Sequence, residues 1–349
     1  MKFKILTYSI SNNYGALLQS LYLKTFLSKK LGYKVELSNF IPFRLFYREN
    51  LKNLLKKEPF KIFENYKKIR SIKRWKKLNS INYFPNFFKR KIKDEVTIYG
   101  SDEIWNFSNP FFGYNSFYFG ASNKNIKIAY AVSIGNANIE NISKSMSDEI
   151  SSLLKSFNLI TVRDQNTSKF VNNLSGKDPI IVVDPTLLIN EFEEGLIKPK
   201  KIEFRYALIY GTYFPDNEKE KILNYCQKRK LTILSVGYFN NWVDKNVINA
   251  DPNDFLNYIM NSSVVFTSMF HGVIFSTKFN KQFWISMDPY RRNKLSYFLE
   301  YLDLNDQIIQ PNSDLERLIN YENINTKLYN WIEKSKKILR SIDNNGYFN

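Results

Sequence analysis

The 349-residue chain has one cysteine, Cys226, and one histidine, His271. A single cysteine excludes an intramolecular disulfide and provides no cysteine cluster for a metal, so a reduced, cytoplasmic setting fits. No apolar run approaches the roughly 20 residues that a membrane-spanning helix needs, and the first residues lack a signal-peptide core. We therefore expect a cytoplasmic protein, at most peripheral on the inner face of the cell membrane, that binds no metal.

Glycine and acidic residues are also scarce. The 12 glycines form no G-x-G-x-x-G fingerprint of the kind that binds a dinucleotide pyrophosphate. Asp and Glu number 33 against 51 Lys and Arg, which gives a formal net charge of +18. Most of this excess lies in residues 44–93, which hold seventeen Lys or Arg and three acidic residues. We call this segment the basic insert.

Hydrophobic residues recur within the basic insert near helical spacing, which indicates a basic amphipathic segment. Two interpretations stay open. The segment contacts an anionic membrane surface, or it forms a helical hairpin whose apolar side packs on the protein while its lysines stay in water. Nucleic-acid binding rests on basicity alone and lacks a recognisable motif, so we expect no nucleic acid among the partners.

Strand-like and helix-like segments alternate along the chain, which is typical of an α/β protein. Residues 190–203 are rich in Glu, Lys and Pro and predict a linker between two domains, residues 1–189 and 204–349. We expect two open Rossmann-like sheets facing a cleft, where ligands bind at the strand ends. The predicted strands cover residues 2–9, 34–40, 95–99, 128–133, 159–162, 180–183, 206–210, 232–236, 264–267 and 283–285. The predicted helices cover residues 15–31, 147–157, 217–229, 254–261, 273–279 and 325–341.

Two polar residues follow predicted strands directly. His271 lies where the strand over residues 264–267 passes into a helix; it is either a core or capping imidazole, or a proton donor or anion binder at the carboxyl end of a strand. Asp102 ends the small-residue turn Gly100-Ser101-Asp102. It is the best carboxylate for accepting a proton, and a turn cap explains it equally well.

Five blocks of sequence carry further information: NNYGALLQ at 12–19, GSDEIWN at 100–106, YAVSIG at 130–135, DPTLL at 184–188 and SMFHGVIFS at 268–276. In this order they resemble the polysaccharide pyruvyl transferase family. The resemblance implies a glycosyltransferase-B-like pair of domains, acceptor side first and donor side second. It also implies transfer of a pyruvate ketal from phosphoenolpyruvate, without another cofactor, onto a sugar of a bacterial exopolysaccharide or capsule repeat unit. The leading alternative is a nucleotide-sugar-dependent glycosyltransferase of the same architecture.

Ketal formation requires an acid, a base and several cations. We expect His271 to act as the acid or as a phosphate ligand, with Gly272 letting backbone approach the anion, and Asp102 to act as the base. The donor-binding candidates are Ser268, Gly272, Arg291, Arg292, Lys294 and Arg163. The acceptor-binding candidates are Asn13, Tyr14, Gly15, Gln19 and Trp105.

Structural explanations compete with several of these roles. A run of basic side chains exposed to water explains Arg291, Arg292 and Lys294 as well. Arg163 is nearly as well explained by a salt bridge to Asp164 or Asp184, and core packing explains Gln19 and Trp105. As a hypothesis, the acceptor is a polyprenyl-pyrophosphate-linked sugar at the inner membrane leaflet, which would account for the basic insert.

Overall fold

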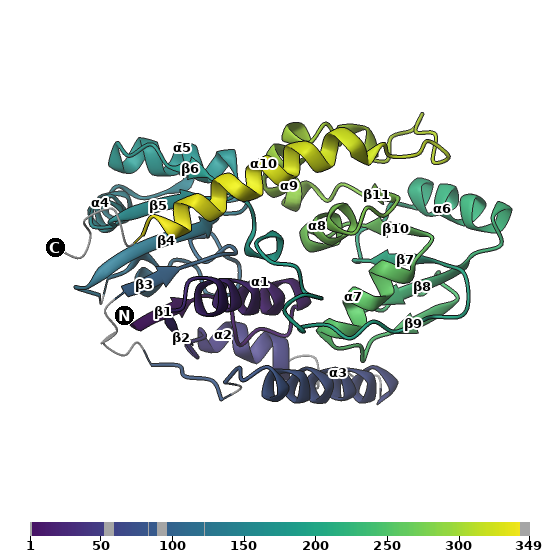
Figure 1. Cartoon of the computed structure of the whole chain (residues 1–349), viewed down its shortest axis with the longest axis horizontal. Helices are drawn as coiled ribbons and strands as arrows, with labels where there is room; N and C mark the ends of the chain where they lie inside the picture. Colours follow the sequence, from purple (N-terminus) through teal and green to yellow (C-terminus); the bar gives the residue numbers. More distant parts are fainter. Residues whose placement is uncertain (1, 52–58, 83, 89–95, 122, 343–349) are drawn as a thin grey trace. The chain divides into compact units, whose positions relative to one another are not determined.

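The computed structural model describes residues 2–51, 59–82, 84–88, 96–121 and 123–342 (Figure 1). Of the basic insert, residues 52–58, 83 and 89–93 lie outside the described residues. The chain divides into two compact units. Unit 1 comprises Met1–Lys52, Lys76–Ile189 and Leu328–Asn349, and unit 2 comprises Asn53–Trp75 and Asn190–Lys327.

Unit 1 is built on a six-stranded sheet of order β2-β1-β3-β4-β5-β6, in which all paired strands are parallel. Its strands are β1 (Lys2–Leu6), β2 (Lys34–Leu37), β3 (Val96–Tyr99), β4 (Ile126–Val132), β5 (Leu159–Val162) and β6 (Ile180–Ile181). Its helices are α1 (Tyr14–Thr25), α2 (Phe43–Phe46), α4 (Lys144–Lys155) and α5 (Gln165–Ser175). Every residue of β3 is buried, because helices cover both faces of a parallel sheet and its central strands are continuously apolar.

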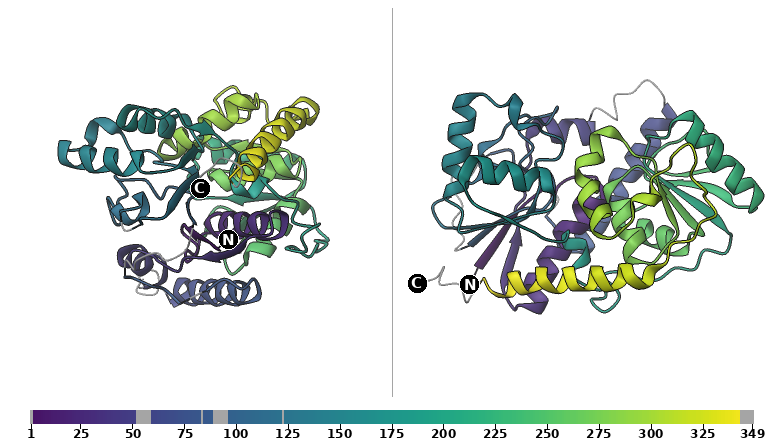
Figure 2. Two further views of the ribbon diagram at one scale, coloured as in Figure 1. Left: turned by 60° about the vertical axis from the view of Figure 1, so that its left-hand side comes forward. Right: turned by 90° about the horizontal axis from the view of Figure 1, so that it is seen from above.

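Unit 2 contains a five-stranded parallel sheet of order β11-β10-β7-β8-β9. Its strands are β7 (Tyr206–Tyr210), β8 (Thr232–Val236), β9 (Lys245–Val247), β10 (Val264–Thr267) and β11 (Phe283–Ile285). Its helices are most of α3 (Pro59–Leu78), α6 (Asp216–Lys228), α7 (Pro252–Asn261), α8 (Phe270–Lys278) and α9 (Arg292–Tyr301). The last helix, α10 (Tyr321–Arg340), begins in unit 2 and ends in unit 1 (Figure 2).

The direction of chain progression reverses once in each sheet. In unit 1, β1 has β2 on one side and β3 on the other; in unit 2, β7 has β8 on one side and β10 on the other. Open α/β sheets bind ligands outside the carboxyl ends of their strands at such a switch point. The segments that follow these strands are residues 7–13 and 100–106 in unit 1, and residues 211–215 and 268–272 in unit 2.

The predicted fold class is confirmed, since both units are parallel α/β sheets. Five predicted strands, residues 159–162, 206–210, 232–236, 264–267 and 283–285, have the observed bounds. The short edge strand β9 and the helices α5 and α9 were not predicted. Helix α8 begins at Phe270, three residues before the predicted start, so His271 lies inside the helix.

The division into units differs from the predicted domains at both ends of unit 2. Residues 53–75 of the basic insert cluster with unit 2, where the Trp75 indole N–H donates to Asn253 Oδ1 at 3.2 Å. The end of α10 clusters with unit 1, where the Trp331 indole N–H donates to Ile181 O at 3.2 Å and the Val183 N–H donates to Ser335 Oγ at 3.1 Å. These bonds complete the edge of the sheet at β6.

The segment predicted as a linker, residues 190–203, contains no helix or strand but is fixed to unit 2. Glu191 is buried and its carboxylate pairs with Lys278. Asn257 of α7 accepts from the Lys200 N–H at 2.7 Å and donates to Lys198 O at 3.1 Å. Among all described helices, none is both long enough and apolar enough to cross a bilayer.

Candidate functional site

Asp102 lies immediately beyond β3, at the switch point of unit 1. Its backbone has φ 77° and that of Gly100 has φ 121°, both in the left-handed region. A Cβ on Gly100 would lie 2.2 Å from Tyr130 O, so only glycine fits there. Asp102 Oδ1 accepts from the Glu103 N–H at 2.9 Å, and the side chain is 19% exposed. The carboxylate is therefore held in place and partly exposed to solvent.

The turn before Asp102 is fixed through Ser101, all of whose hydrogen-bonding groups are engaged. The Ser101 N–H and hydroxyl donate to Gln19 Oε1 at 3.2 and 2.9 Å, and its carbonyl accepts from Thr7 Oγ1 at 2.9 Å. Gln19 Nε2 donates in turn to Thr7 Oγ1 at 2.8 Å and to Ala16 O at 3.0 Å. Because Gln19 is fully buried, it does not contact an acceptor sugar as predicted; it positions the turn that carries Asp102.

Arg163, at the carboxyl end of β5, connects two carboxylates of unit 1. Its guanidinium lies 3.0 Å from Asp184 Oδ2 and 3.8 Å from Asp102 Oδ1, and the side chain is 3% exposed. The predicted salt bridge to Asp184 is therefore present. The guanidinium that was a donor-binding candidate is paired with Asp184 and lies beside Asp102, a link that the sequence did not predict.

Asp164 is a second carboxyl group at this edge of the sheet, and it is closed to substrate. It is fully buried and caps α5, accepting from the Thr167 N–H at 2.8 Å and from Ser133 Oγ at 2.6 Å. Burial raises the pKa of Asp164, and these hydrogen bonds act in the opposite direction. Asp102 is thus the accessible carboxylate of the pair.

The loop after β1 is held by the start of the basic insert. Glu49 accepts from the Ser11 hydroxyl at 3.0 Å and from the Asn12 N–H at 2.9 Å. Asn13 then caps α1, its Oδ1 accepting from the Gly15 N–H at 2.9 Å. Of the five acceptor-binding candidates only Asn13 is partly exposed, since the other four are buried.

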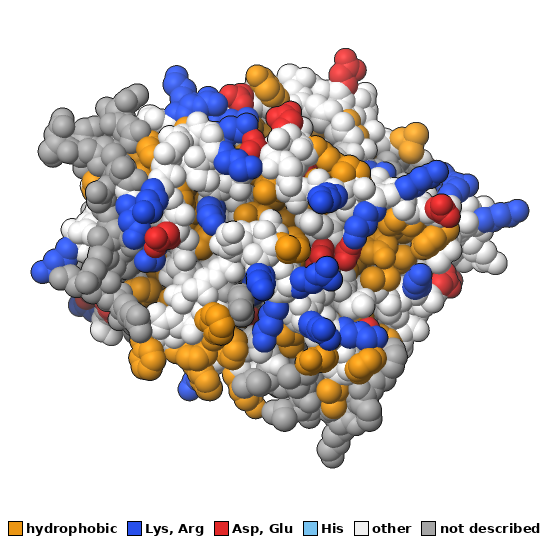
Figure 3. All heavy atoms as spheres, turned by 60° about the horizontal axis from the view of Figure 1, so that its bottom comes forward, with side chains coloured by type: hydrophobic (Ala, Val, Ile, Leu, Met, Phe, Trp, Pro, Cys, Tyr) orange, Lys and Arg blue, Asp and Glu red, His pale blue; other side chains and the backbone are white. Residues whose placement is uncertain are grey.

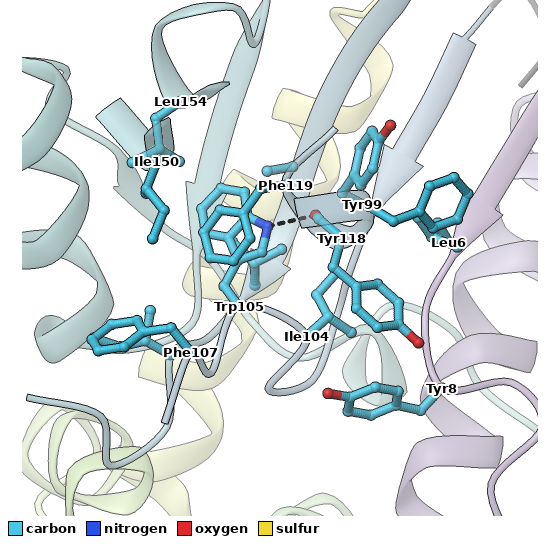
Figure 4. Close-up of a cluster of buried hydrophobic side chains, with 14 of the residues drawn as sticks. Leu6, Tyr8, Tyr99, Ile104, Trp105, Phe107, Tyr118, Phe119, Ile150 and Leu154 are labelled. Carbon is cyan, nitrogen blue, oxygen red and sulfur yellow. Dashed lines mark hydrogen bonds between the residues drawn. The ribbon is translucent and has the colours of Figure 1, made fainter. Parts of the chain in front are cut away.

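Trp105 lies in the hydrophobic core of unit 1 (Figure 4). Its indole N–H donates to Tyr118 O at 2.8 Å, its ring stacks on Phe119 with centroids 5.3 Å apart, and none of the residue is exposed. The ring therefore faces the core, in agreement with the packing explanation, and is not exposed for stacking on a sugar. The aromatic rings that pack against it belong to Phe119 and Phe157, which its own neighbours in sequence do not reveal.

His271 occupies the first turn of α8, at the switch point of unit 2. The Met269 N–H before it donates to Thr267 Oγ1 at 3.0 Å, and that hydroxyl donates to Tyr210 O at 2.7 Å, which ties the turn to β7. The imidazole packs edge-on against Phe270, with centroids 5.1 Å apart, and is 8% exposed. It therefore sits at a helix N-terminus, where backbone N–H groups and the helix dipole favour an anion.

The glycines around His271 serve close packing. A Cβ on Gly272 would lie 2.2 Å from Thr267 Oγ1 and 2.9 Å from Tyr210 Cδ1, so α8 sits against β10 and β7 only because this side chain is absent. This explains Gly272 without the predicted approach of backbone to an anion. Gly211, with φ 131°, likewise leaves room for Ser268, since a Cβ there would lie 2.2 Å from Ser268 Oγ.

Ser268 is buried, and its Oγ accepts from the Tyr213 N–H at 3.3 Å. Gly211 was missed by sequence reasoning, although one signal was available: it directly follows a buried strand, as Gly100 does in unit 1. The three basic donor candidates do not form one cluster. Arg291 pairs with Asp288, whereas Arg292 and Lys294 lie two residues apart on α9, a spacing that points side chains in different directions.

The basic insert contributes a lysine to the carboxyl edge of the unit 2 sheet. Lys68 of α3 donates from Nζ to Gly237 O at 2.8 Å, and its ammonium lies 5.3 Å from the centre of the Tyr238 ring. Gly237 directly follows β8. Throughout the described ranges, no three His, Cys, Asp or Glu side chains come together as a metal site would require.

One known family matches most of the chain. A model of the family described as polysaccharide pyruvyl transferase matches residues 13–286, which include Asp102 and His271. The chain belongs to this family. A polysaccharide pyruvyl transferase is a transferase that uses a saccharide acceptor, and the resemblance seen in the five sequence blocks is confirmed.

Solved structures support the fold of this chain. An S. aureus MnaA–UDP co-structure is similar with 11% identity and a TM-score of 0.50, covering 98% of this chain and 96% of that one. UDP-GlcNAc 2-epimerase from Neisseria meningitidis bound to UDP-GlcNAc is similar with 11% identity and a TM-score of 0.50, covering 97% and 94%. At this identity the likeness concerns the fold alone. A search of curated proteins returned no match.

Proposed function

We propose that the protein forms a pyruvate ketal on a sugar of an exopolysaccharide or capsule repeat unit, with phosphoenolpyruvate as donor. The observation that carries the proposal is the placement of Asp102 and His271. Each lies at the switch point of its own sheet, where open α/β folds bind ligands, and both belong to the part of the chain that matches the family.

The donor is assigned to the switch point of unit 2. Phosphoenolpyruvate carries a carboxylate and a phosphate, and the N-terminal turn of α8 favours negative charge. We assign His271 to protonate the methylene carbon, because a positioned imidazole is the side chain most often used as a general acid. Lys68 of α3, whose Nζ donates to Gly237 O just after β8, supplies a cation at this edge that the family resemblance alone does not identify.

The acceptor is assigned to the switch point of unit 1. One sugar hydroxyl adds to C2 of the donor as the methylene carbon gains a proton and becomes methyl. A second hydroxyl then displaces the phosphate, which leaves as inorganic phosphate with the second proton. Asp102 is assigned as the base that accepts a hydroxyl proton, with Arg163 holding the carboxylate from 3.8 Å away.

The acceptor is further proposed to be linked to a polyprenyl pyrophosphate at the inner membrane leaflet, where the basic insert contacts anionic headgroups. The excess of seventeen Lys or Arg over three acidic residues in residues 44–93 supports this, because a basic segment is attracted both to pyrophosphate and to an anionic bilayer.

The test is incubation of the purified protein with phosphoenolpyruvate and a lipid-linked or model galactoside. Phosphate release matched by a mass gain of the acceptor supports the proposal, whereas nucleotide release from a nucleotide sugar identifies a glycosyltransferase instead. His271→Gln and Asp102→Asn are expected to lower kcat about 10²- to 10⁴-fold, the usual contribution of an acid or base. Asp148→Asn, the same chemical change on the exposed face of α4, is the matched control.

One further variant separates the two roles of His271. An arginine binds phosphate but does not release its proton near neutral pH. His271→Arg should therefore be as inactive as His271→Gln if the imidazole donates the proton. Retained transfer activity in His271→Arg would make His271 a phosphate ligand and would leave the acid to another group.

A further inference from the structure

Five aromatic side chains lie exposed on unit 1, at the two ends of the basic insert. Phe43 and Tyr47 are 58% and 40% exposed, and Phe84, Phe87 and Phe88 are 65%, 37% and 71% exposed. We call these five residues the aromatic patch. On the face shown in Figure 3, hydrophobic side chains reach the surface with Lys and Arg side chains close by.

The aromatic patch is held together although its members are some forty residues apart in sequence. Residues 84–88 run beside residues 39–41: the Ile41 N–H donates to Asn86 O at 3.0 Å and the Asn86 N–H donates to Asn39 O at 2.9 Å. Asn39 Nδ2 also donates to Phe84 O at 3.1 Å. The patch is therefore a built surface rather than a set of unrelated side chains.

Packing beneath the patch fixes which aromatic rings face outward. In α2, Leu45 is buried while Phe43 and Arg44 are exposed. The Phe87 ring lies 5.4 Å from the Phe43 ring and 5.3 Å from the Phe46 ring. Phe46 is only partly exposed and packs on the core of unit 1, so it anchors the outer rings to the sheet. Exposed aromatic surface of this kind marks an interaction site.

The charge of the surrounding sequence indicates the partner. Residues 76–93, which belong to unit 1 as the aromatic patch does, contain six Lys or Arg and no Asp or Glu. A second copy of this chain would bring like charges together across a two-fold interface, which is unfavourable. An anionic bilayer accepts both components, because cations are attracted to its headgroups and aromatic side chains enter its interface.

We propose that the aromatic patch docks the protein on the surface of an anionic lipid bilayer, with Phe84 and Phe88 entering the headgroup region. The inference rests on the proposed function in one respect: it takes the bilayer to be the place where the protein binds its lipid-linked acceptor. The hydrophobic side chains of α3 are divided: Ile72 and Trp75 are buried in the protein, whereas Phe63 and Tyr66 are 56% and 54% exposed. The aromatic patch lies outside this helix, on unit 1.

Vesicle flotation tests this proposal without phosphoenolpyruvate or acceptor, so its outcome is separate from that of the transfer assay. The wild-type protein should float with vesicles that contain phosphatidylglycerol, and less with vesicles of phosphatidylcholine alone. Phe84→Ser/Phe88→Ser should weaken binding about tenfold or more, because affinity scales with buried apolar area. Leu318→Ser/Tyr329→Ser is the matched control, since these side chains are 75% and 64% exposed elsewhere on the chain, and it should bind as the wild type does.

Three results would overturn the inference. The first is that the wild-type protein does not bind anionic vesicles. The second is that the Phe84→Ser/Phe88→Ser variant binds them as tightly as the wild type, which would make charge alone responsible. In the third, the phenylalanine variant converts a dimer to a monomer by light scattering while its vesicle affinity stays unchanged, which identifies a second copy as the partner.

Discussion

Gln19 accepts two hydrogen bonds from Ser101, one from its N–H at 3.2 Å and one from its hydroxyl at 2.9 Å. This side-chain amide, on the first helix of the chain, therefore sets the path of the backbone that leads into Asp102. The arrangement gives Gln19 a structural role in placing Asp102 that requires no contact with a ligand.

Replacing Gln19 should separate positioning from sugar binding. Gln19→Leu leaves buried polar groups of Ser101 and Thr7 without their partner, which costs about 1–3 kcal/mol for each such group. We expect kcat to fall with the KM for the acceptor little changed, measured in the phosphate-release assay. A rise in KM at unchanged kcat would instead restore Gln19 as an acceptor contact. Gln19→Glu keeps an acceptor for the Ser101 hydroxyl and should retain more activity than Gln19→Leu.

Trp105 should respond as a core residue. Trp105→Ala removes a fully buried ring and is expected to cost about 3–5 kcal/mol of unfolding free energy, seen as a lower midpoint in chemical denaturation. Trp105→Phe keeps most of the packing and should cost less. Under conditions where the variants stay folded, their KM for the acceptor should match the wild type; a selective rise in KM would argue for sugar stacking after all.

Gly272 should be intolerant of even one methyl group. Gly272→Ala places a Cβ against Thr267 and Tyr210, and overpacking of this kind costs about 1–3 kcal/mol. Because the displaced helix carries His271, transfer activity should fall together with thermal stability. Ser276→Ala, at a fully buried position of the same helix, is the control and should change neither; equal stability of Gly272→Ala and wild type would contradict the packing.

The reactivity of the buried thiol of Cys226 should measure how often unit 2 unfolds. Burial first, and the Asp244 charge second, raise the pKa of this thiol to about 12. At pH 8 the native protein should react with a disulfide reagent only at the rate of unfolding, and rapid labelling without denaturant would contradict the burial. In the unfolded chain the thiol loses its proton at about pH 8.5, whereas the folded chain retains it. The free energy of unfolding should therefore fall as the pH rises above that value. Cys226→Ala should flatten that part of the pH–stability curve.

Much of the fold could be predicted because parallel strands that are buried on both faces appear in the sequence as short, mostly apolar runs. The runs at 206–210 and 264–267 carry no competing helical period, and their bounds were predicted correctly. Helix α5, QNTSKFVNNLS, was missed because few of its residues are apolar. Its start was nevertheless signalled, since Asp164 is an N-cap residue that accepts from the N–H three residues later.

The candidate site was predicted in part, and the limit was long-range packing. Asp102 and His271 were identified because each follows a strand, a local signal. Gln19 and Trp105 lie in the same sequence blocks as the other candidate contacts. Only the fold shows that Gln19 is hydrogen-bonded to Ser101, and that Trp105 bonds to Tyr118 O and stacks on Phe119. The membership of α10 in unit 1 depends on Trp331 and Ile181, which are 150 residues apart.

The return of α10 to unit 1 has a consequence for the order in which the protein is assembled on the ribosome. Ile181 of β6 and the nearby Val183 are synthesised long before Trp331 and Ser335, which form hydrogen bonds with them. Domains that are continuous in sequence fold as they emerge, but unit 1 remains with an open edge until the last helix has left the exit tunnel. A fragment that ends at residue 189 therefore has a sheet with an open edge. Adding the α10 segment as a separate peptide should complete that edge.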